Sequence, residues 1–130
     1  MNVLLDTHIL LWWLDDSPRL GAAARMRISN PAQRVFISSA SLWEIRIKHK
    51  LGKLALPANF DEALDRSAFN WLSITRHHAS ATAELAPHHR DPFDRMLVAQ
   101  AQCEGLTLLT ADDRLAAYGP NVLYVAAMPA

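Results

Sequence analysis

The sequence predicts an α/β fold whose mostly parallel central sheet is covered by helices on both faces. Short apolar runs alternate along the chain with runs in which apolar residues recur at helical spacing. This alternation favours strand–helix–strand units, which build parallel sheets. The clearest unit runs from Asp91 to Asp112, where an N-cap residue and Pro92 open an apolar-periodic helix. Gly105 ends that helix, and the apolar run 106–109 suits a strand buried on both faces.

The N-terminal half begins with an apolar strand followed by a helix. Residues 3–5 form the strand, which ends at Asp6, and Thr7 is placed to cap the helix. Turn-forming residues such as Asn30-Pro31 and Gly52 separate the elements that follow. We expect helices over residues 8–14, over 20–28 and from Ser39 or Ser41 to about residue 50, with a second strand over residues 35–38.

The C-terminal half continues the alternation of helices and strands. Pro57 starts a polar connection, after which apolar side chains gather on one helix face. A short helix follows Asp112 and stops at Gly119-Pro120, because proline cannot continue it. We expect helices over residues 60–69, 76–85, 92–104 and 114–118, and strands over residues 71–74, 106–109 and 122–125.

The composition predicts one domain over residues 1–130. Of the 130 residues, 51% are hydrophobic and 20% are charged, which is typical of a globular chain with a core. No apolar run approaches the roughly 20 residues of a membrane span. The chain starts Met1-Asn2-Val3 without a basic leader, and its one cysteine, Cys103, fits a reducing compartment. We therefore expect a cytoplasmic protein without membrane contact.

Four acidic residues fall at the ends of predicted strands. Asp6, Glu44 and Asp94 lie at strand-to-helix junctions, and Asp112 follows the strand over residues 106–109. Because these ends meet at one edge of a parallel sheet, we expect the four carboxylates to lie together. Carboxylates brought close together repel one another unless a cation neutralises them. Ligands that are all oxygen favour Mg²⁺ or Mn²⁺ over zinc.

Some of these residues also have a purely structural interpretation. Asp6 suits the positive end of a helix dipole, and Ser41-x-x-Glu44 fits a capping box. The pairs His77-His78 and His88-His89 show no metal-binding spacing, so we expect them on the surface or in loops.

A carboxylate-bound metal suits phosphoryl transfer. It polarises a phosphate oxygen and activates a water molecule at neutral pH. The sequence has no glycine-rich phosphate-binding motif, which disfavours a nucleotide-binding fold. The formal net charge of zero gives no separate indication of nucleic-acid binding.

The same acids lie in motifs that resemble those of a known family. The motifs are Leu4-Leu5-Asp6-Thr7-His8, Ser41-Leu42-Trp43-Glu44-Ile45, Arg90-Asp91-Pro92-Phe93-Asp94-Arg95 with Ala99-Gln100-Ala101, and Leu109-Thr110-Ala111-Asp112. In order and spacing over the whole chain, they are similar to the PIN domain, specifically to the VapC toxins of bacterial VapBC toxin–antitoxin pairs. The resemblance implies a PIN-like three-layer α/β/α sandwich. It also implies a Mg²⁺- or Mn²⁺-dependent endoribonuclease toxin that cleaves structured RNA, such as tRNA or rRNA.

The resemblance further assigns roles and partners. The residues that match the family's acids are Asp6, Glu44, Asp94 and, as the fourth and more variable one, Asp112 rather than Asp113. We expect Asp6 and Asp94 to hold the main metal, with the other acids acting through water or a second metal. The residues that match supporting positions are Thr7 and Thr110, whose hydroxyls orient the acids, and Asp91, a helix cap. The implied partners are a VapB-type antitoxin that blocks the site and a second copy of the chain in a homodimer.

Basic and apolar side chains suggest the contact surfaces. The candidates for RNA binding are Arg46, Lys48, Lys50, Lys53, Arg90 and Arg95. As alternatives, the lysine run forms a solvated helix face, and Arg95 pairs with a neighbouring acid. The apolar residues 10–14 belong mostly to the core, and the rest suit a dimer face or an antitoxin groove. Two rival functions remain. One is a different metal-dependent phosphoryl enzyme, such as a small phosphatase or a DNA nuclease, that uses the same acids. The other is a PIN regulator that binds RNA or a partner without cleavage.

Overall fold

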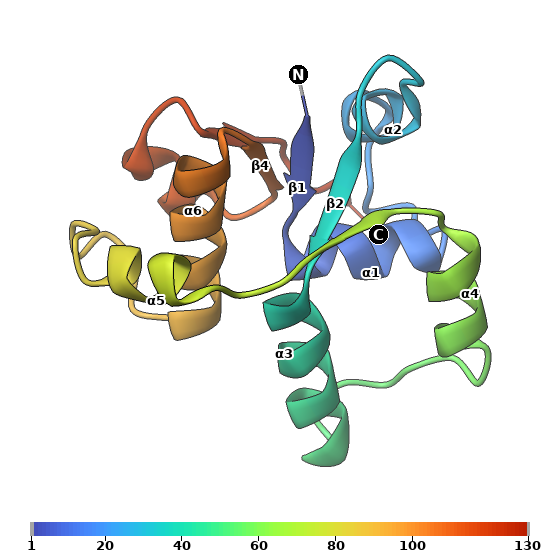
Figure 1. The fold of residues 1–130 in the computed structure, drawn as a ribbon. Helices are drawn as coiled ribbons and strands as arrows, with labels where there is room; N and C mark the ends of the chain where they lie inside the picture. The colour runs from blue at the N-terminus through green and yellow to red at the C-terminus, as the bar shows by residue number, and fades with distance from the viewer. Residues whose placement is uncertain (1, 130) are drawn as a thin grey trace.

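A parallel five-stranded sheet lies between two layers of helices in the computed structural model, which describes residues 2–129 (Figure 1). The strand order is β3-β2-β1-β4-β5, and each neighbouring pair is parallel. The strands are β1 (Val3–Leu5), β2 (Val35–Ser38), β3 (Asn70–Leu72), β4 (Thr107–Thr110) and β5 (Val122–Tyr124). The helices are α1 (Thr7–Leu14), α2 (Ala22–Ser29), α3 (Ser39–Lys50), α4 (Phe60–Arg66), α5 (Arg76–Thr82), α6 (Pro92–Glu104) and the 3₁₀ helix η1 (Asp113–Tyr118). The predicted three-layer α/β/α sandwich is confirmed.

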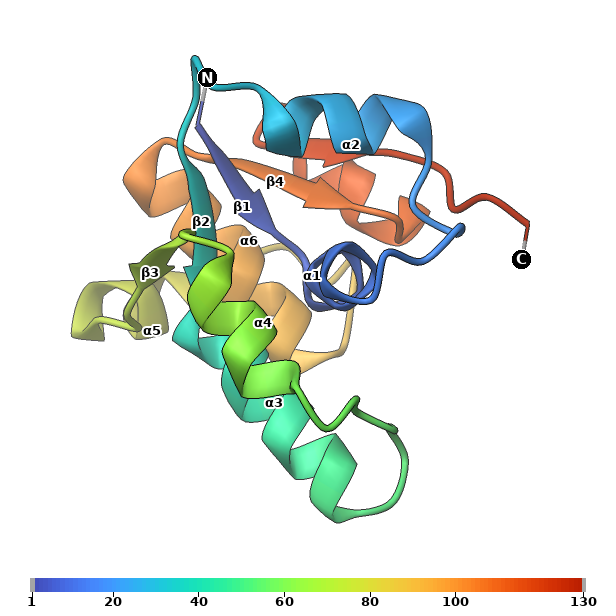
Figure 2. The ribbon, with the colours of Figure 1, turned by 90° about the vertical axis from the view of Figure 1, so that its right-hand side faces the viewer.

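Alternating strand side chains divide the core into two clusters, one on each face of the sheet. Val3 and Leu5 of β1 pack with residues of α1, α2 and α4, whereas Leu4 packs with residues of α6 and η1. Figure 2 shows α1 and α4 in front of β1 and α6 behind it. Both faces of the strand are therefore covered, which explains why β1 is apolar at every position.

The strand order reverses at β1, with β2 and β3 on one side of it and β4 and β5 on the other. In open α/β sheets, ligands bind outside the carboxyl ends of the strands at such a reversal. Asp6 directly follows β1, and Asp112 lies two residues beyond the end of β4. The topology therefore brings two of the predicted acids to the expected binding edge.

Helix α1 begins one residue earlier than predicted. Its N-cap is Asp6, whose Oδ1 accepts the backbone N–H of His8 at 3.0 Å. Thr7 is the first helical residue rather than the cap, so its hydroxyl is available for a contact elsewhere.

Helix α3 is capped by Ser38, whose Oγ accepts the Ala40 amide at 3.0 Å. The predicted capping box between Ser41 and Glu44 is therefore wrong, because both residues lie inside the helix. Glu44 is buried on the helix side that faces α1, and its carboxylate is free to take part in the site.

Helices α4 and α5 are shorter than predicted. Helix α4 ends at Arg66 because Ala68 adopts a left-handed backbone conformation with φ of 56°. Helix α5 ends at Thr82, whose hydroxyl donates to the Ala79 carbonyl. The longest helix, α6, has 13 residues, and no helix within residues 2–129 is long and apolar enough to cross a membrane.

His78 is buried, which contradicts its predicted surface position. Its Nδ1 accepts the Thr75 amide at 3.1 Å, and its Nε2 lies 2.7 Å from Oε2 of Glu104. Nδ1 thus closes the N-terminal cap of α5, and Nε2 joins α5 to α6. The sequence shows no pattern that pairs His78 with Glu104.

Candidate functional site

Asp6 is buried at the carboxyl end of β1 and is held by two donors. Its Oδ1 accepts the His8 amide, and its Oδ2 accepts the hydroxyl of Thr110 at the end of β4. The same Thr110 Oγ1 accepts the backbone N–H of Asp112 at 3.0 Å. One hydroxyl therefore ties the end of β1 to the segment that carries the fourth acid.

Glu44 is buried on α3 and faces Thr7 of α1. Thr7 Oγ1 donates to Oε1 of Glu44 at 2.8 Å, and Lys48 Nζ lies 2.5 Å from Oε2. Thr7 Oγ1 also lies 3.1 Å from Oγ of Ser41. The carboxylate is thus oriented by a hydroxyl on one side and an ammonium group on the other.

Asp94 lies in the first turn of α6. The N-cap of this helix is Asp91, whose Oδ1 accepts the amides of Phe93 at 2.8 Å and Asp94 at 3.1 Å. Pro92 occupies the first helical position, where no amide donor is needed. The cap that the sequence predicts therefore also fixes the backbone of the acid next to it.

Asp112 receives four hydrogen bonds. Its Oδ1 accepts the backbone N–H and the Nε–H of Arg114, each at 3.0 Å. Its Oδ2 accepts Nη2 of Arg114 at 2.9 Å and lies 3.0 Å from Nε2 of His89. Asp113 begins η1 and makes none of these contacts, so the structure places Asp112 rather than Asp113 next to His89 and Asp94.

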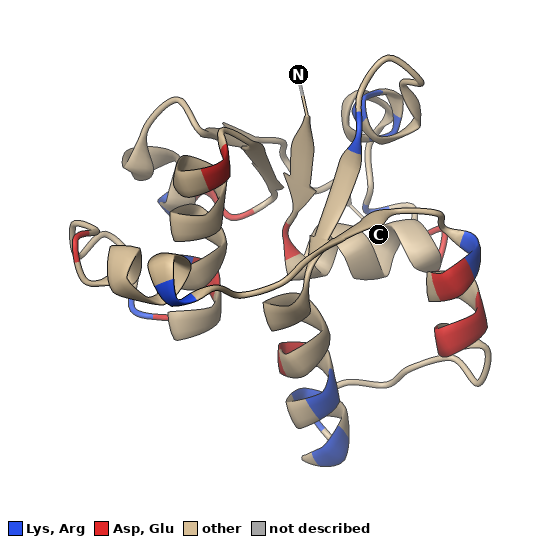
Figure 3. Ribbon diagram, viewed as in Figure 1, with Lys and Arg blue, Asp and Glu red and all other residues tan. Residues whose placement is uncertain are grey.

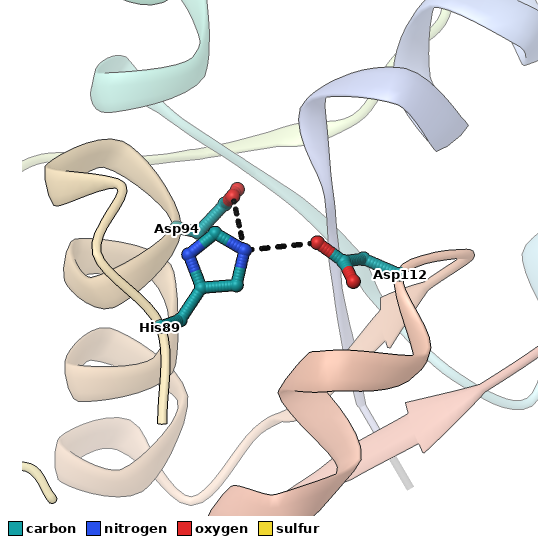
Figure 4. Close-up of side chains that lie close together, drawn as sticks. All are labelled: His89, Asp94 and Asp112. Atoms are coloured by element: carbon teal, nitrogen blue, oxygen red, sulfur yellow. Dashed lines mark hydrogen bonds and ion pairs between the residues drawn. The ribbon is translucent and has the colours of Figure 1, made fainter. Parts of the chain in front are cut away.

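His89 lies in a loop, one of its two expected positions, but it is buried between two of the acids rather than placed on the surface. Its Nε2 lies 3.0 Å from Oδ2 of Asp112 and 3.5 Å from Oδ2 of Asp94 (Figure 4). The three side chains form the one His/Cys/Asp/Glu group within residues 2–129 whose ligand atoms are close enough to share a metal. A signal was present in the sequence, since His89 stands two residues before the cap of α6, but its adjacency to His88 obscured it.

The charges of the acids act on one another. Burial, followed by the charges of Asp6, Asp91, Glu44 and Asp112, raises the pKa of Asp94 to about 8. Burial also raises the pKa of Asp6. Arg114, with His89 as a further donor, lowers the pKa of Asp112 to about 2. Several carboxyls that cannot easily ionise together form a site that a cation would neutralise.

The predicted basic residues have different surroundings. Lys48 contacts Glu44, and both lysines 48 and 53 line a pocket with Thr7 and Glu44. Lys50 and Arg90 are exposed. Figure 3 shows that basic segments gather toward the C-terminal end of α3, beyond an acidic segment of the same helix.

Two predicted RNA-binding arginines point elsewhere. Arg46 pairs with Asp61 of α4 and lies over the ring of Phe60, 5.4 Å from its centroid. The guanidinium of Arg95 donates to four backbone carbonyls between residues 82 and 89 and to the hydroxyl of Tyr118. Arg95 therefore fixes the loop before α6 and pairs with no acid in the part of the chain that the structure describes, contrary to the alternative interpretation.

Two apolar pockets with no residue in common flank the site. One, of about 460 Å³, includes Leu11 and Trp12 of α1, Leu56 and Phe60. The other, of about 390 Å³, includes Trp43, which is 59% exposed and packs edge-on against Phe93 at 5.3 Å between ring centroids. Of the predicted apolar run, Leu10 is buried, while residues 11–14 are partly exposed.

Comparison with known proteins supports the resemblance seen in the sequence. The chain is 29% identical to Ribonuclease VapC22 of Mycobacterium tuberculosis, a match that covers 88% of this chain and 89% of that protein. Two solved structures share the fold. VapBC2 from Rickettsia felis, bound to a promoter DNA fragment, has a TM-score of 0.73 at 18% identity and covers 98% of this chain and 100% of its own. DNA-bound VapBC from Salmonella typhimurium has a TM-score of 0.68 at 22% identity and covers 97% of this chain and 98% of its own.

A family model described as the PIN domain matches residues 3–120. The match spans strands β1 to β4 and includes Asp6, Glu44, Asp94 and Asp112. The chain therefore belongs to the PIN domain family.

Proposed function

We propose that this protein is a metal-dependent endoribonuclease toxin of a toxin–antitoxin pair that cleaves structured RNA such as tRNA or rRNA. The observation that carries the proposal is the surroundings of Asp94. The charges of four other carboxylates act on it, and with burial they raise its pKa to about 8. A structural role gives no reason to gather so many acids, whereas a Mg²⁺ or Mn²⁺ ion would neutralise them.

The hydrogen bonds indicate which acids hold the cation directly. Each oxygen of Asp6 accepts one hydrogen bond and keeps a lone pair, and among residues 2–129 the carboxylate of Asp94 has only the neighbouring His89 at 3.5 Å. Asp112 already accepts four hydrogen bonds, which use its four lone-pair sites. Asp6 and Asp94 are therefore the direct ligands in this proposal, and Asp112 acts through water.

Glu44 completes the proposed site from α3. Thr7 and Lys48 each hold one of its oxygens, so it also reaches a cation through water or takes part in binding a second ion. When bound, such a cation polarises a phosphate oxygen and lowers the pKa of a water molecule. Lys48 and Lys53 line the pocket beside Glu44, where they are placed to hold RNA phosphates near the acids.

The similar protein named Ribonuclease VapC22 favours RNA over DNA or a phosphomonoester as substrate. The VapBC complexes with the same fold favour a VapB-type antitoxin as partner. We assign the antitoxin to the pocket of α1 and α4, and a homodimer contact to the exposed face around Trp43. Cytoplasmic RNA as substrate implies a cytoplasmic location.

Asp94→Asn tests the function. This nearly isosteric change removes a charge that the cation needs, so we expect metal-dependent cleavage of total bacterial RNA to fall by more than about a hundredfold. The measurement incubates antitoxin-free protein with RNA, with and without Mn²⁺ or Mg²⁺, and separates the fragments on a gel. Asp113→Asn is the matched control, since this neighbouring acid makes none of the site contacts and should leave cleavage unchanged.

The rival functions predict other results. Cleavage that persists in Asp94→Asn would show that the site is assigned wrongly. Faster metal-dependent hydrolysis of single-stranded DNA or a phosphomonoester than of RNA would favour a DNA nuclease or a phosphatase. Metal binding by calorimetry together with RNA binding, but without cleavage of any RNA in the pool, would favour the non-cleaving regulator.

A further inference from the structure

His89 is held by a hydrogen bond on each side of its ring. The backbone N–H of Asp91 donates to Nδ1 at 3.0 Å, and Nε2 lies 3.0 Å from the Asp112 carboxylate. The ring is 5% exposed, so water does not compete strongly for either nitrogen. Its Nε2 also faces Asp94 at 3.5 Å (Figure 4).

These contacts determine where the ring carries its proton. An amide N–H can only donate, so Nδ1 must present a lone pair to Asp91. In a neutral imidazole the proton then belongs to Nε2, which donates it to Asp112. Both hydrogen bonds are satisfied in this tautomer, and in the opposite tautomer two donors would face each other at Nδ1.

The same tautomer prevents His89 from binding a metal through Nε2. A histidine ligand uses a nitrogen lone pair, but the Nε2 lone pair is replaced by a proton. Moving that proton to Nδ1 would break the hydrogen bond to the Asp91 amide. Asp91 caps α6 through Oδ1, so this change would disturb the turn that carries Asp94.

We propose that His89 is a positioning residue that uses its Nε2–H to hold the Asp112 carboxylate beside Asp94 for the cation, and that it is not a metal ligand. This inference rests on the proposed metal site. It assigns His89 a task that the acids cannot perform, because two carboxylates have no proton to share when both are ionised. Partners that orient metal-binding groups typically contribute about tenfold to a hundredfold in metal affinity.

The first test observes the ring nitrogens directly. Histidine labelled with ¹⁵N is followed by NMR in the wild-type protein, first metal-free and then saturated with Mg²⁺, with saturation measured by calorimetry. The signals that disappear in His89→Asn identify His89. We expect the proton to stay on Nε2 after Mg²⁺ binds, and its transfer to Nδ1 or the loss of the Nε2 proton would overturn the proposal.

Two variants of His89 test the hydrogen bonds at Nδ1 and at Nε2 separately. In His89→Asn the side-chain oxygen can still accept the Asp91 amide, but no donor reaches Asp112. In His89→Gln the side-chain N–H reaches the place of Nε2 and can donate to Asp112. We expect His89→Asn to weaken Mg²⁺ and Mn²⁺ binding about tenfold alike, and His89→Gln to restore most of that affinity.

If His89 were a metal ligand, its loss would change the affinities for Mn²⁺ and Mg²⁺ to different extents. Imidazole prefers Mn²⁺ over the harder Mg²⁺, so losing a histidine ligand would weaken Mn²⁺ binding more than Mg²⁺ binding. That pattern, or no effect of His89→Asn on either ion, contradicts the positioning role. A wild-type protein that binds neither ion in calorimetry would instead contradict the proposed function. Equal melting temperatures of the metal-free variants and the wild type show that a change in metal affinity comes from the site and not from a loss of folding.

Discussion

Asp94 carries a carboxyl whose ionisation opposes folding in the absence of a metal. Its pKa rises from the ordinary value of 3.8 to about 8 in the folded protein. Between these values the folded protein keeps a proton that the unfolded chain has lost. The stability that this proton gives is complete below about pH 4 and is lost as the pH rises through 8. The raised pKa of Asp6 acts in the same direction.

Asp94→Asn should therefore flatten the pH dependence of stability in the metal-free protein. We expect the free energies of unfolding of variant and wild type to be similar near pH 4. At pH 8.5 the variant should be more stable by about 2 kcal/mol, a value reduced for the solvent that screens this partly exposed carboxyl. Urea denaturation in a chelating buffer at several pH values measures both. A parallel pH profile for the two proteins would show that Asp94 ionises as freely as in the unfolded chain.

At the same scale, the sequence predicted that the acids lie near one another, but it did not predict which residues donate hydrogen bonds to Asp112. Asp6, Asp94 and Asp112 stand beside predictable strand and helix ends, so their gathering follows from topology. The hydrogen bonds of Asp112 with His89 and Arg114 depend on side-chain directions in the turns around residues 89 and 114. Periodicity carries no information about such turns, which explains why the burial of His89 was not predicted.

At the scale of elements, the N-cap residues of the helices were harder to predict than the helical segments that follow them. The start of α6 was predicted because Asp91, Pro92 and Gly105 mark its two ends in the sequence. Helix α3 starts at Ser39, one of the two expected residues, but its cap was not predicted because Ser38, Ser39 and Ser41 can each accept a backbone amide. Ser38 takes the cap because it is the last residue of β2 and is fully buried. Moving the cap by three residues turned Glu44 from a capping residue into a site residue.

The loop before α6 depends on Arg95, whereas the neighbouring Arg90 is exposed. Arg95→Lys removes the planar set of donors that reaches several carbonyls at once, and one ammonium group cannot replace it. We expect the free energy of unfolding to fall by about 2 kcal/mol.

Arg90→Ala should leave stability unchanged, weaken RNA binding and reduce the slope of log affinity against log salt by about 1.

Denaturation and RNA titrations over a salt series distinguish the two arginines. Both measurements use Asp94→Asn protein as the background, so that RNA is not consumed. Arg66→Ala is the control for a lost surface charge, because Arg66 is exposed on α4 and pairs only with Glu62 among the ion pairs within residues 2–129. A loss of RNA affinity in Arg66→Ala equal to that in Arg90→Ala would mean that net charge, rather than position, determines binding.

At the scale of the whole molecule, the parallel sheet and its two helical layers follow from the alternation of strand and helix patterns. The strand order does not, because Val3–Leu5, Val35–Ser38 and Thr107–Thr110 are all short, apolar and equally suited to the centre of a sheet. The order of the strands is determined only when the helices pack on the two faces of the sheet. That order explains why the acids meet beside β1 and β4. Surfaces for partners are likewise a property of the assembled fold, since each apolar pocket combines segments distant in sequence.

Because the two apolar pockets share no residue, one substitution in each can test the antitoxin contact and the homodimer contact independently. Trp12 belongs to the pocket of α1 and α4, and Trp43 to the pocket beside α6. We expect Trp12→Glu to weaken binding of the cognate antitoxin and leave the chain a dimer, because a buried charge opposes an apolar contact. Trp43→Glu should give a monomer that still binds the antitoxin.

Size-exclusion chromatography with light scattering measures both effects on the same samples, with each variant alone and mixed with the antitoxin. The two tryptophans control for each other, since each change introduces the same charge into an apolar pocket. A monomer from Trp12→Glu and lost antitoxin binding from Trp43→Glu would reverse the assignment of the pockets. A wild-type chain that remains monomeric at all concentrations would remove the homodimer, and the pocket around Trp43, whose side chain is 59% exposed, would then be left without an assigned partner.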